Sequence, residues 1–329
     1  MRVRLSLATA ISEDLESALN GLDKDLFKSK RILMTGGAGF IGSWLCDALV
    51  SMGSAVHCID NLSTGLIENI THLPASNFVF QKSDVTSLQQ SDEKYETILH
   101  FASHASPDEF QQRPIETLAA NANGTQNMLE LARKSDATLL YASSSEIYGD
   151  AEIVPTPETY WGKVNPIGLR SCYDEGKRVG EAFCVAYHRT YDLDVRIIRF
   201  FNTYGPRLRS DGIYGRALSR FVKQALSGKE ITVYGTGRQT RSFCYISDTL
   251  RAILLATSRT RMKNEIINVG NPQEISILEL AEKIKTLTAS KSRTTFLAAA
   301  PDDPQRRCPD ISKAKKSSIG TQTYRLMLD

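Results

Sequence analysis

Short hydrophobic runs alternate with amphipathic segments along the chain from residue 31 onwards. The runs have the length of strands and are apolar at successive positions, which is typical of strands buried on both faces. The expected strands lie in RILMTG (31–36), AVHCIDN (55–61), NFVFQKSDV (77–85), YETILHFAS (95–103), ATLLYASSS (137–145) and LDVRIIRFFN (193–202). The segments between them, such as FIGSWLCDALVSMG (40–53) and PIETLAANANGTQNMLELARKS (114–135), have the spacing of helices.

This alternation predicts an α/β fold, in which helices cover both faces of a parallel sheet. After residue 200 the pattern changes, because long loops rich in glycine, proline and arginine separate short helices from short strands. Near the N-terminus, hydrophobic residues at helical spacing predict a short helix packed on the domain. We therefore expect a helical extension over 1–30, a main sheet domain over 31–200, and a smaller lobe over most of 201–329.

Composition and charge narrow the classes of partner. The chain has 329 residues and a formal net charge of only +3, with no large basic block, so nucleic acid is not expected as a partner. No apolar stretch is long enough to span a membrane, and the N-terminal segment has no convincing signal-peptide cleavage site. Six scattered cysteines form no CxxC pair, which favours buried free thiols in a reducing, cytoplasmic compartment over disulfides or a metal site.

A glycine-rich turn, TGGAGFIG (35–42), joins the first expected strand to the first expected helix. Gly36, Gly39 and Gly42 permit a tight turn and a close approach of the backbone to a pyrophosphate, and the helix N-terminus favours the phosphate charge. Asp60 ends the second strand, where its carboxylate can accept hydrogen bonds from the adenosine ribose, and no arginine follows it to meet a 2′-phosphate. The pattern predicts a Rossmann-type, doubly wound sheet that binds NAD rather than NADP. Asp84, after the third strand, is a further candidate for the adenine contact, although aspartate is also common in ordinary loops.

A candidate catalytic pair lies in RSCYDEGKR (170–178), a charged segment with almost no apolar face. Tyr173 and Lys177 are four residues apart, so they share one face of a helix. A nearby ammonium and a positive nicotinamide ring would both favour the phenolate, which lowers the tyrosine pKa and lets Tyr173 accept a proton from a sugar hydroxyl. A chance pair on a solvated helix is the alternative, and the glycine-rich turn makes the catalytic interpretation the better one.

Two more candidates follow the fifth expected strand, in ASSSEIYG (142–149). Ser144 can hydrogen-bond the reacting hydroxyl. Glu146 can serve in acid–base work or orient a water molecule, although a solvated turn glutamate would give the same local sequence.

Together these motifs resemble the extended short-chain dehydrogenase/reductase family of nucleotide-sugar enzymes, the NAD-dependent epimerase/dehydratases. The run PETYWGKVNPIGLRSCYDEGKR (157–178) is more specific and is similar to the signature of the UDP-glucuronate decarboxylases (UDP-xylose synthases), with Leu169 where those proteins usually have proline. The resemblance covers about residues 31 to 315. Further matches are DNLSTG (60–65), FNTYGPR (201–207), TVYGTGRQTRSFCYISD (232–248) and DDPQRRCPDISKAK (302–315).

The resemblance implies a role for each matching residue. The implied catalytic residues are Ser144 (usually threonine in the family), Glu146, Tyr173, Lys177 and Arg307, which handles the glucuronate carboxylate. The implied substrate-binding residues near UDP are Asn202, Arg207 and Arg241, with Arg307 at the sugar. The implied cofactor-binding residues are Gly36, Gly39, Phe40, Ile41, Gly42, Asp60, Asn61, Ser63, Thr64, Gly65, Asp84, Val85, Ala102, Tyr173 and Lys177. Arginine suits a diphosphate because its planar guanidinium donates hydrogen bonds in pairs.

The resemblance also implies a reaction, the NAD-dependent decarboxylation of UDP-glucuronate to UDP-xylose through a 4-keto sugar, in a homodimer and without a metal. A UDP-sugar 4-epimerase would use the same serine, tyrosine and lysine, but it has no need for Glu146 or Arg307. A 4,6-dehydratase would need an acid at Ser145. A non-catalytic NAD-binding regulator with this fold is the remaining alternative, and loss of Tyr173 or Lys177 would have favoured it.

Three departures from the family pattern stand out. His104 lies where the family has proline, so it is expected to be a loop histidine rather than a catalytic residue. The segment LAANANGT (118–125) lacks a lysine that usually contacts the cofactor. The tail SSIGTQTYRLMLD (317–329) does not continue as the family does, so an altered C-terminal helix is expected there.

Overall fold

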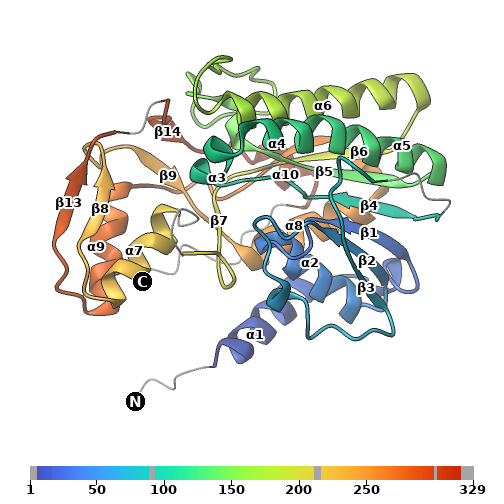
Figure 1. Cartoon of the computed structure of the whole chain (residues 1–329), viewed down its shortest axis with the longest axis horizontal. Helices are drawn as coiled ribbons and strands as arrows, with labels where there is room; N and C mark the ends of the chain where they lie inside the picture. Colours follow the sequence, from blue (N-terminus) through green and yellow to red (C-terminus); the bar gives the residue numbers. More distant parts are fainter. Residues whose placement is uncertain (1–5, 89–92, 211–215, 300–301, 320–329) are drawn as a thin grey trace.

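The computed structural model describes residues 6–88, 93–210, 216–299 and 302–319. A seven-stranded parallel sheet forms its centre, in the order β11-β6-β5-β4-β1-β2-β3 (Figure 1). Its strands are β1 (Arg31–Thr35), β2 (Ala55–Asp60), β3 (Phe78–Lys82), β4 (Thr97–His100), β5 (Thr138–Ser144), β6 (Val195–Phe200) and β11 (Ile266–Val269). The strand order reverses at β1 and β4, the arrangement of a doubly wound sheet. The predicted α/β fold class is therefore confirmed.

One strand of this sheet comes from the region expected to form the smaller lobe. β11 pairs with β6 at the sheet edge, and the helix before it, α8 (Ile246–Ser258), covers a face of the same sheet. β11 follows the change to a loop-rich pattern after residue 200, so the sequence does not distinguish its apolar run from the short strands of the smaller lobe. The expected boundary at residue 200 remains a prediction, with the chain returning to the main sheet after it.

Helices cover both faces of the sheet (Figure 1). One face carries α8 and α2 (Phe40–Ser51). The other carries α4 (Pro114–Ala119), a π-helical turn (Ala120–Gly124), α5 (Thr125–Ser135) and α6 (Ser171–Tyr191), with the short α3 (Pro107–Gln112) near the end of α4. The segment 114–135 is continuously helical, as predicted, although it contains the π turn.

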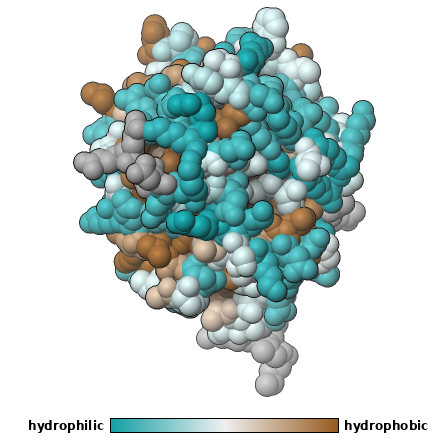
Figure 2. Space-filling view, turned by 90° about the vertical axis from the view of Figure 1, so that its right-hand side faces the viewer, coloured by the Kyte–Doolittle hydropathy of each residue, from teal (hydrophilic) through white to brown (hydrophobic). Residues whose placement is uncertain are grey.

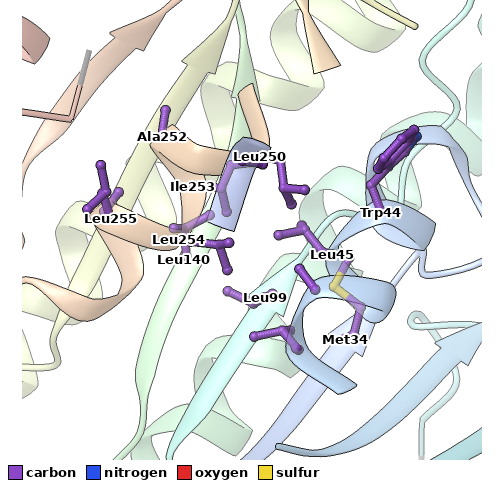
Figure 3. Packing of buried hydrophobic residues seen from close by; sticks show 14 of the residues in the cluster. Met34, Trp44, Leu45, Leu99, Leu140, Leu250, Ala252, Ile253, Leu254 and Leu255 are labelled. Atoms are coloured by element: carbon purple, nitrogen blue, oxygen red, sulfur yellow. The ribbon is translucent and has the colours of Figure 1, made fainter. Parts of the chain in front are cut away.

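The larger core lies between the sheet and the α2/α8 layer. Figure 3 shows leucines of α8 lying against Leu99 and Leu140 of the sheet, with Leu45 of α2 beside them. These side chains are fully buried, and burial of each leucine contributes about 1.5–3 kcal/mol to the free energy of unfolding. A second core lies under α5 and α6, on the opposite face of the sheet.

Helix α6 approaches the sheet closely at two glycines. A Cβ atom on Gly180 would lie 2.1 Å from the Tyr141 hydroxyl oxygen on β5, and a Cβ on Gly176 would lie 3.1 Å from the Cβ of Asn121. Glycine at both positions lets the helix pack at this distance. The close packing brings Tyr173 and Lys177, on the same helix, to the carboxyl end of β5.

The N-terminal extension contains a helix, as predicted. Helix α1 (Leu7–Leu19) begins with a Ser6 cap and packs against α8 and α2. The Tyr245 hydroxyl donates a hydrogen bond to the Asp14 carboxylate, with an O–O distance of 2.6 Å, and so connects the extension to the start of α8.

In its described residues, the smaller lobe contains three short sheets packed with two helices (Figure 1). Its helices are α7 (Ala217–Leu226) and α9 (Ile277–Thr288), and these pack around their own apolar core. Its strands are β7 (Thr203–Tyr204), β8 (Ile231–Tyr234), β9 (Thr240–Ser242), β10 (Cys244–Tyr245), β12 (Glu274–Ser276), β13 (Thr294–Leu297) and β14 (Arg306–Arg307). A last short helix, α10 (Ser312–Lys316), returns to β11. The expected change in the tail falls largely on residues 320–329, outside the described residues.

The face of the molecule in Figure 2 is mostly hydrophilic, with hydrophobic residues in small separate patches. Among the described residues, no helix combines the length and apolar character that a membrane span requires. Within the same residues, no group of three or more His, Cys, Asp or Glu side chains is arranged to hold a metal ion.

The packing of α6 can be tested by substituting Ala for Gly180. In an ordinary helix interior this change stabilises the helix by about 0.5–1 kcal/mol. Here the added methyl group collides with Tyr141, so we expect a loss of about 1–3 kcal/mol in the free energy of unfolding, measured by urea denaturation. Gly53→Ala is not a suitable control, because Gly53 has a positive φ that alanine adopts only with strain. The control is Ala182→Gly, at an exposed position of α6, which should lower the free energy of unfolding only by the difference in helix propensity, about 1 kcal/mol. An unchanged or higher stability of Gly180→Ala would contradict the proposed close packing.

Candidate active site

A large cleft lies between the carboxyl ends of the sheet strands and the smaller lobe. Its volume is about 540 Å³, within the range of small-molecule sites. It is lined by the glycine-rich turn, by the ends of β2 to β6, by the N-terminal end of α6 and by loops of the smaller lobe. Ligands of open parallel sheets bind at this edge, where the strand order reverses.

The glycine-rich turn has the geometry that its sequence predicts. Gly36 has a φ of +73°, and a Cβ on it would lie 2.8 Å from the backbone nitrogen of Ala102. A Cβ on Gly42 would lie 2.1 Å from the carbonyl oxygen of Gly36. Gly39 precedes the first residue of α2, and the start of that helix lines the cleft. The turn therefore presents bare backbone and a helix N-terminus, which suit a pyrophosphate.

The Asp60 carboxylate lies at the edge of the same turn. It accepts hydrogen bonds from the backbone N–H groups of Ala38, at 3.0 Å, and Leu62, at 2.8 Å. Burial raises the pKa of Asp60, and these two hydrogen bonds partly oppose the rise. A Cβ on Gly65 would lie 2.9 Å from an Asp60 oxygen, so glycine leaves room beside the carboxylate. The group is fixed, and a ribose can still reach it from the cleft.

Asp84, the second acidic candidate, is hydrogen-bonded to Asn61, the residue that follows Asp60. Asn61 Nδ2 donates to Asp84 at 2.7 Å, and Thr86 donates to the other Asp84 oxygen through its backbone and its hydroxyl. Although burial acts in the opposite direction, these hydrogen bonds lower the pKa of Asp84. Ser63, Thr64 and Val85 line the cleft beside them. These residues, with the bare turn, form a site that fits NAD.

His104 is a loop residue, as expected, but its side chain is buried in the wall of the cleft. Its Nδ1 lies 3.3 Å from the Thr117 hydroxyl, and its Nε2 has no hydrogen-bond partner among the described residues. Burial lowers the pKa of His104. Polar loop residues are generally solvated, so the sequence alone did not indicate this burial.

Ser144, Tyr173 and Lys177 meet at the end of β5. The Ser144 hydroxyl is within hydrogen-bonding reach of the Tyr173 phenol. Lys177 Nζ donates to the carbonyl oxygen of Ala142 at 2.8 Å and lies 5.7 Å from the centre of the Tyr173 ring. All three residues line the cleft. The structure thus brings together the predicted hydroxyl, phenol and amine.

The pKa values of Tyr173 and Lys177 differ from those expected for a phenolate stabilised by an ammonium. Burial raises the pKa of Tyr173 to about 12, and the hydrogen bond with Ser144 opposes the rise. Burial also lowers the pKa of Lys177 to about 7, so the amine is only partly charged at neutral pH. Within the protein alone, the cost of burying a phenolate therefore outweighs the hydrogen bond with Ser144 and the charge of Arg216. The positive charge of a nicotinamide ring would act in the opposite direction.

Glu146 lies at the centre of a buried ion-pair cluster. Arg307 donates to both Glu146 carboxylate oxygens, with the Nη2–Oε2 distance at 2.7 Å, and Arg170 donates to Oε2 from the other side. Burial would raise the pKa of Glu146, but Arg170 and Arg307 lower it to about 2. Asp174 lies behind Arg170, and burial and the charge of Glu146 raise its pKa to about 7. Glu146 is therefore a carboxylate throughout the physiological pH range.

The smaller lobe contributes the substrate side of the cleft. Arg241 and Arg307 are paired positions on the neighbouring strands β9 and β14. Arg241 forms an ion pair with Asp303 at 2.8 Å, and Asn202 Nδ2 donates to the Ser242 carbonyl oxygen at 2.9 Å. Asn202, Arg241 and Arg307 all line the cleft.

Arg207 does not line the cleft, so the geometry does not support the expectation that it contacts UDP. Its Nη2 forms an ion pair with Asp47 of α2 at 2.7 Å, and its guanidinium lies 5.3 Å from the Trp44 ring centre. Asp47 also binds His72 at 2.7 Å. Arg207 thus fastens its loop to α2, outside the residues that line the cleft. A glycine–proline–arginine loop gives no local signal for the direction of its side chain.

Several cleft residues were not predicted. They are Arg170, Arg209, Arg216, Arg220 and Asp303, which line the cleft, and Asp174, which lies behind Arg170. Arginine enrichment in the loops after residue 200 was a usable signal for the lobe residues. Arg170 and Asp174 lie close to Tyr173 in sequence, but only their burial shows that they belong to the site.

The turn, the acid and the tyrosine–lysine pair define a dinucleotide-dependent enzyme, in which a ligand bound against Tyr173 can be oxidised or reduced. The chain belongs to the NAD dependent epimerase/dehydratase family, whose model matches residues 32–270. This membership confirms the expected NAD cofactor and the extended short-chain dehydrogenase/reductase family.

Curated and solved relatives agree with this result. UDP-glucuronic acid decarboxylase 1 of Xenopus tropicalis is 48% identical over 287 residues, which cover 87% of this chain and 67% of that protein. The crystal structure of UDP-glucose 4-epimerase with UDP-glucose from Thermotoga maritima matches with a TM-score of 0.82 and 27% identity, covering 90% of this chain and 94% of that one. UDP-glucose 4-epimerase of Thermus thermophilus, in complex with NAD, matches with a TM-score of 0.78 and 26% identity, over 90% and 94% of the two chains. The expected similarity to UDP-glucuronate decarboxylases is confirmed.

The lowered pKa of Lys177 predicts a specific pH dependence of stability. Between pH 7 and about 10, the unfolded chain keeps the lysine proton and the folded chain has lost it, so stability rises with pH. Relative to Lys177→Met, which does not titrate, the wild type should therefore gain free energy of unfolding, by at most about 1.4 kcal/mol per pH unit. Urea denaturation of both proteins at pH 7, 8, 9 and 10, without added nucleotide, measures this difference. A difference that stays constant with pH would show that Lys177 keeps its ordinary pKa.

Proposed function

We propose that the protein is an NAD-dependent UDP-glucuronate decarboxylase that forms UDP-xylose. One observation supports this function above the others, namely that Glu146 and Arg307 lie in the same cleft as Ser144, Tyr173 and Lys177. A cation for the sugar carboxylate thus lies near a tyrosine that can accept the proton of the sugar hydroxyl when NAD⁺ oxidises it. The identity with curated decarboxylases supports the same substrate.

The cofactor site provides positions for each part of NAD. The turn from Gly36 to Gly42 would hold the pyrophosphate, Asp60 the adenosine ribose, and Asp84 with Val85 the adenine. Ala102 and Lys177 would border the nicotinamide ribose. When bound, NAD would supply the hydride chemistry at C4 of the sugar, first as acceptor and then as donor.

The residues at the end of β5 would carry out the proton transfer at the sugar. Tyr173 accepts the proton of the C4 hydroxyl, with Ser144 hydrogen-bonded to the same oxygen. Lys177 adds positive charge beside the phenol and is held toward it by the carbonyl of Ala142. These steps leave a ketone at C4, which is β to the C6 carboxylate.

Arg307 and Glu146 would act on the carboxylate end of the sugar. A β-keto acid loses CO₂ readily, because the electrons left at C5 are delocalised into the ketone as an enolate. Arg307 would orient the carboxylate for this step. The ionised Glu146 would orient a water molecule at C5, where a proton must be added before the ketone is reduced.

The nucleotide would bind along the smaller lobe. Asn202 and Arg241 are the predicted contacts that line the cleft, and Arg209 and Arg216 join them there. Arg209 also donates to the Thr64 carbonyl oxygen at 2.9 Å, which connects this loop to the cofactor side. Guanidinium groups on both sides suit a diphosphate.

A UDP-sugar 4-epimerase is the second candidate, because both solved relatives described above are epimerases. The same serine, tyrosine and lysine would serve that reaction. It gives no role to the Glu146–Arg307 pair, and a buried ion pair without a function is costly to maintain.

The decisive measurement uses UDP-glucuronate labelled at C6, incubated with the protein and NAD⁺. We expect labelled CO₂ together with UDP-xylose. Arg307→Ala and Glu146→Gln should slow CO₂ release severely, and Tyr173→Phe should lower the rate by about 10²–10⁴ because the general base is lost. UDP-galacturonate without CO₂ would identify an epimerase, and bound NAD without any turnover would favour a non-catalytic regulator.

A homodimer is part of the proposal. Ile115 and Leu118 of α4 and Val179 of α6 are exposed apolar side chains on two helices that pack together, with exposed fractions of 78%, 41% and 38%. Two copies of this helix pair can bury these side chains against each other. All six cysteines are free and buried, which supports a reducing, cytoplasmic location.

Val179→Glu should convert the dimer to a monomer, because the new charge would be buried at the interface without a partner. Sedimentation equilibrium measures the mass of each species. Leu226→Glu is the matched control, because Leu226 is 70% exposed on α7 of the smaller lobe. A monomeric wild type, or a Val179→Glu protein that remains dimeric, would exclude this interface.

A further inference from the structure

The cluster around Glu146 contains an arginine for which the proposed reaction has no role so far. Arg170 is 6% exposed and lines the cleft, and its Nη2 donates to the Glu146 oxygen Oε2. Its Nε lies 3.7 Å from Asp174, which is 5% exposed. Nε of Arg170 and Oδ1 of Asp174 have no hydrogen-bond partner among the described residues.

Arg170 is held rigidly beside the catalytic tyrosine. It directly precedes the first residue of α6, so only three positions separate it from Tyr173. Its guanidinium lies 5.6 Å from the centre of the Phe110 ring, and that ring stacks on Tyr173 with centroids 5.1 Å apart and planes 8° apart. Asp174 and Phe110 therefore fix the cation that faces Glu146.

Arg307, in contrast, would have to bind two carboxylates, that of Glu146 and that of the sugar. Both of its terminal nitrogens donate to Glu146, so the sugar carboxylate must share or replace these hydrogen bonds. A largely buried glutamate that lost its only cation would take up a proton or move towards water, because an unpaired charge in such a place is unfavourable. Arg170 supplies Glu146 with a second cation, which does not bind the substrate carboxylate.

We propose that Arg170 is a positioning residue, which holds Glu146 in place as a carboxylate when Arg307 binds the carboxylate of the substrate. This inference rests on the proposed decarboxylase function and adds to it a division of labour between two arginines. Arg307 is the exchangeable partner, and Arg170 is the permanent one. Asp174 keeps Arg170 oriented through the ion pair at its Nε.

The test compares Arg170→Gln with the wild type in the presence of NAD⁺. Loss of a residue that orients a catalytic group typically costs about 10–100-fold in activity. We expect kcat for CO₂ release to fall by this factor, with the affinity for UDP-glucuronate relative to UDP-xylose changed less than about threefold. UDP-xylose lacks the carboxylate, so this ratio of affinities, measured by calorimetry, reports on carboxylate binding alone. Arg307→Ala should lower the same ratio strongly.

The pH profile separates positioning from a purely structural role. The charged and titratable groups that face Glu146 are Arg170, Tyr173 and Asp174 from α6, Arg307 from β14 and Arg241 from β9. Without Arg170, Glu146 should be protonated at a higher pH, so kcat for Arg170→Gln should fall on acidification where the wild type does not. Arg170→Lys, which keeps the charge, should lack the acid-sensitive step, although its kcat should stay below that of the wild type at every pH. Asp174→Asn identifies any step in the profile that belongs to Asp174.

A second buried arginine provides the matched control. Arg199 is 7% exposed and forms an ion pair with Glu181 of α6 at 2.7 Å, but it does not line the cleft. Arg199→Gln should lower the melting temperature without adding the acid-sensitive step. If Arg170→Gln fails to fold, Arg170→Lys carries the test, because it should show a lower kcat than the wild type with the ratio of affinities unchanged.

The possible outcomes are distinct. Wild-type kcat and an unchanged pH profile in Arg170→Gln would overturn the role of Arg170 alone. A fall in the affinity for UDP-glucuronate relative to UDP-xylose would make Arg170 a carboxylate-binding residue, which also overturns the proposal. A wild type that releases no CO₂ would overturn the proposed function, and this inference with it.

Discussion

The active site depends on how closely α6 lies against β5. With glycine at position 180, the helix packs directly on the Tyr141 side chain. At this distance Lys177 reaches the Ala142 carbonyl oxygen, and Tyr173 comes to the Ser144 hydroxyl. The same helix start fixes Arg170 against Glu146. One helix position thus sets the geometry of the phenol, the amine and the arginine together.

Close packing also removes these groups from water, so their charges must be balanced within the protein. Glu146 lies between arginines from two parts of the fold, because Arg170 directly precedes α6 and Arg307 belongs to the smaller lobe. Glu146 and Arg307 are 161 residues apart in sequence. Their ion pair therefore connects the sheet to the lobe at the place where the sugar would bind. A substrate that engages Arg307 acts at once on the chemistry and on the contact between the two parts.

Local rules explain which features could be predicted from the sequence. The turn from Gly36 to Gly42, the acid at Asp60 and the Tyr173–Lys177 pair each depend on neighbours within one turn or one strand, so their spacing alone indicates them. Strand β11 was not assigned to the main sheet because it follows the change to a loop-rich pattern after residue 200, and only its pairing with β6 shows where it belongs. The direction of a loop side chain depends on distant partners, which explains why Arg207 was expected at UDP and is found on Asp47. The burial of Arg170, Asp174 and His104 is likewise a property of the assembled fold.

The attachment of α1 to α8 has a consequence for the order in which parts of the chain reach their native contacts. Asp14 on α1 binds Tyr245, 231 residues further along, and the helix packs on α8 directly after that tyrosine. A ribosome that adds about 5–20 residues per second needs roughly 10–50 s to cover this interval. For that time the apolar side of α1 lacks the α8 part of its native contact, while the strands of the sheet emerge one after another. Helix α1 is synthesised before the strands of the sheet and is thus among the last elements to reach its final partner.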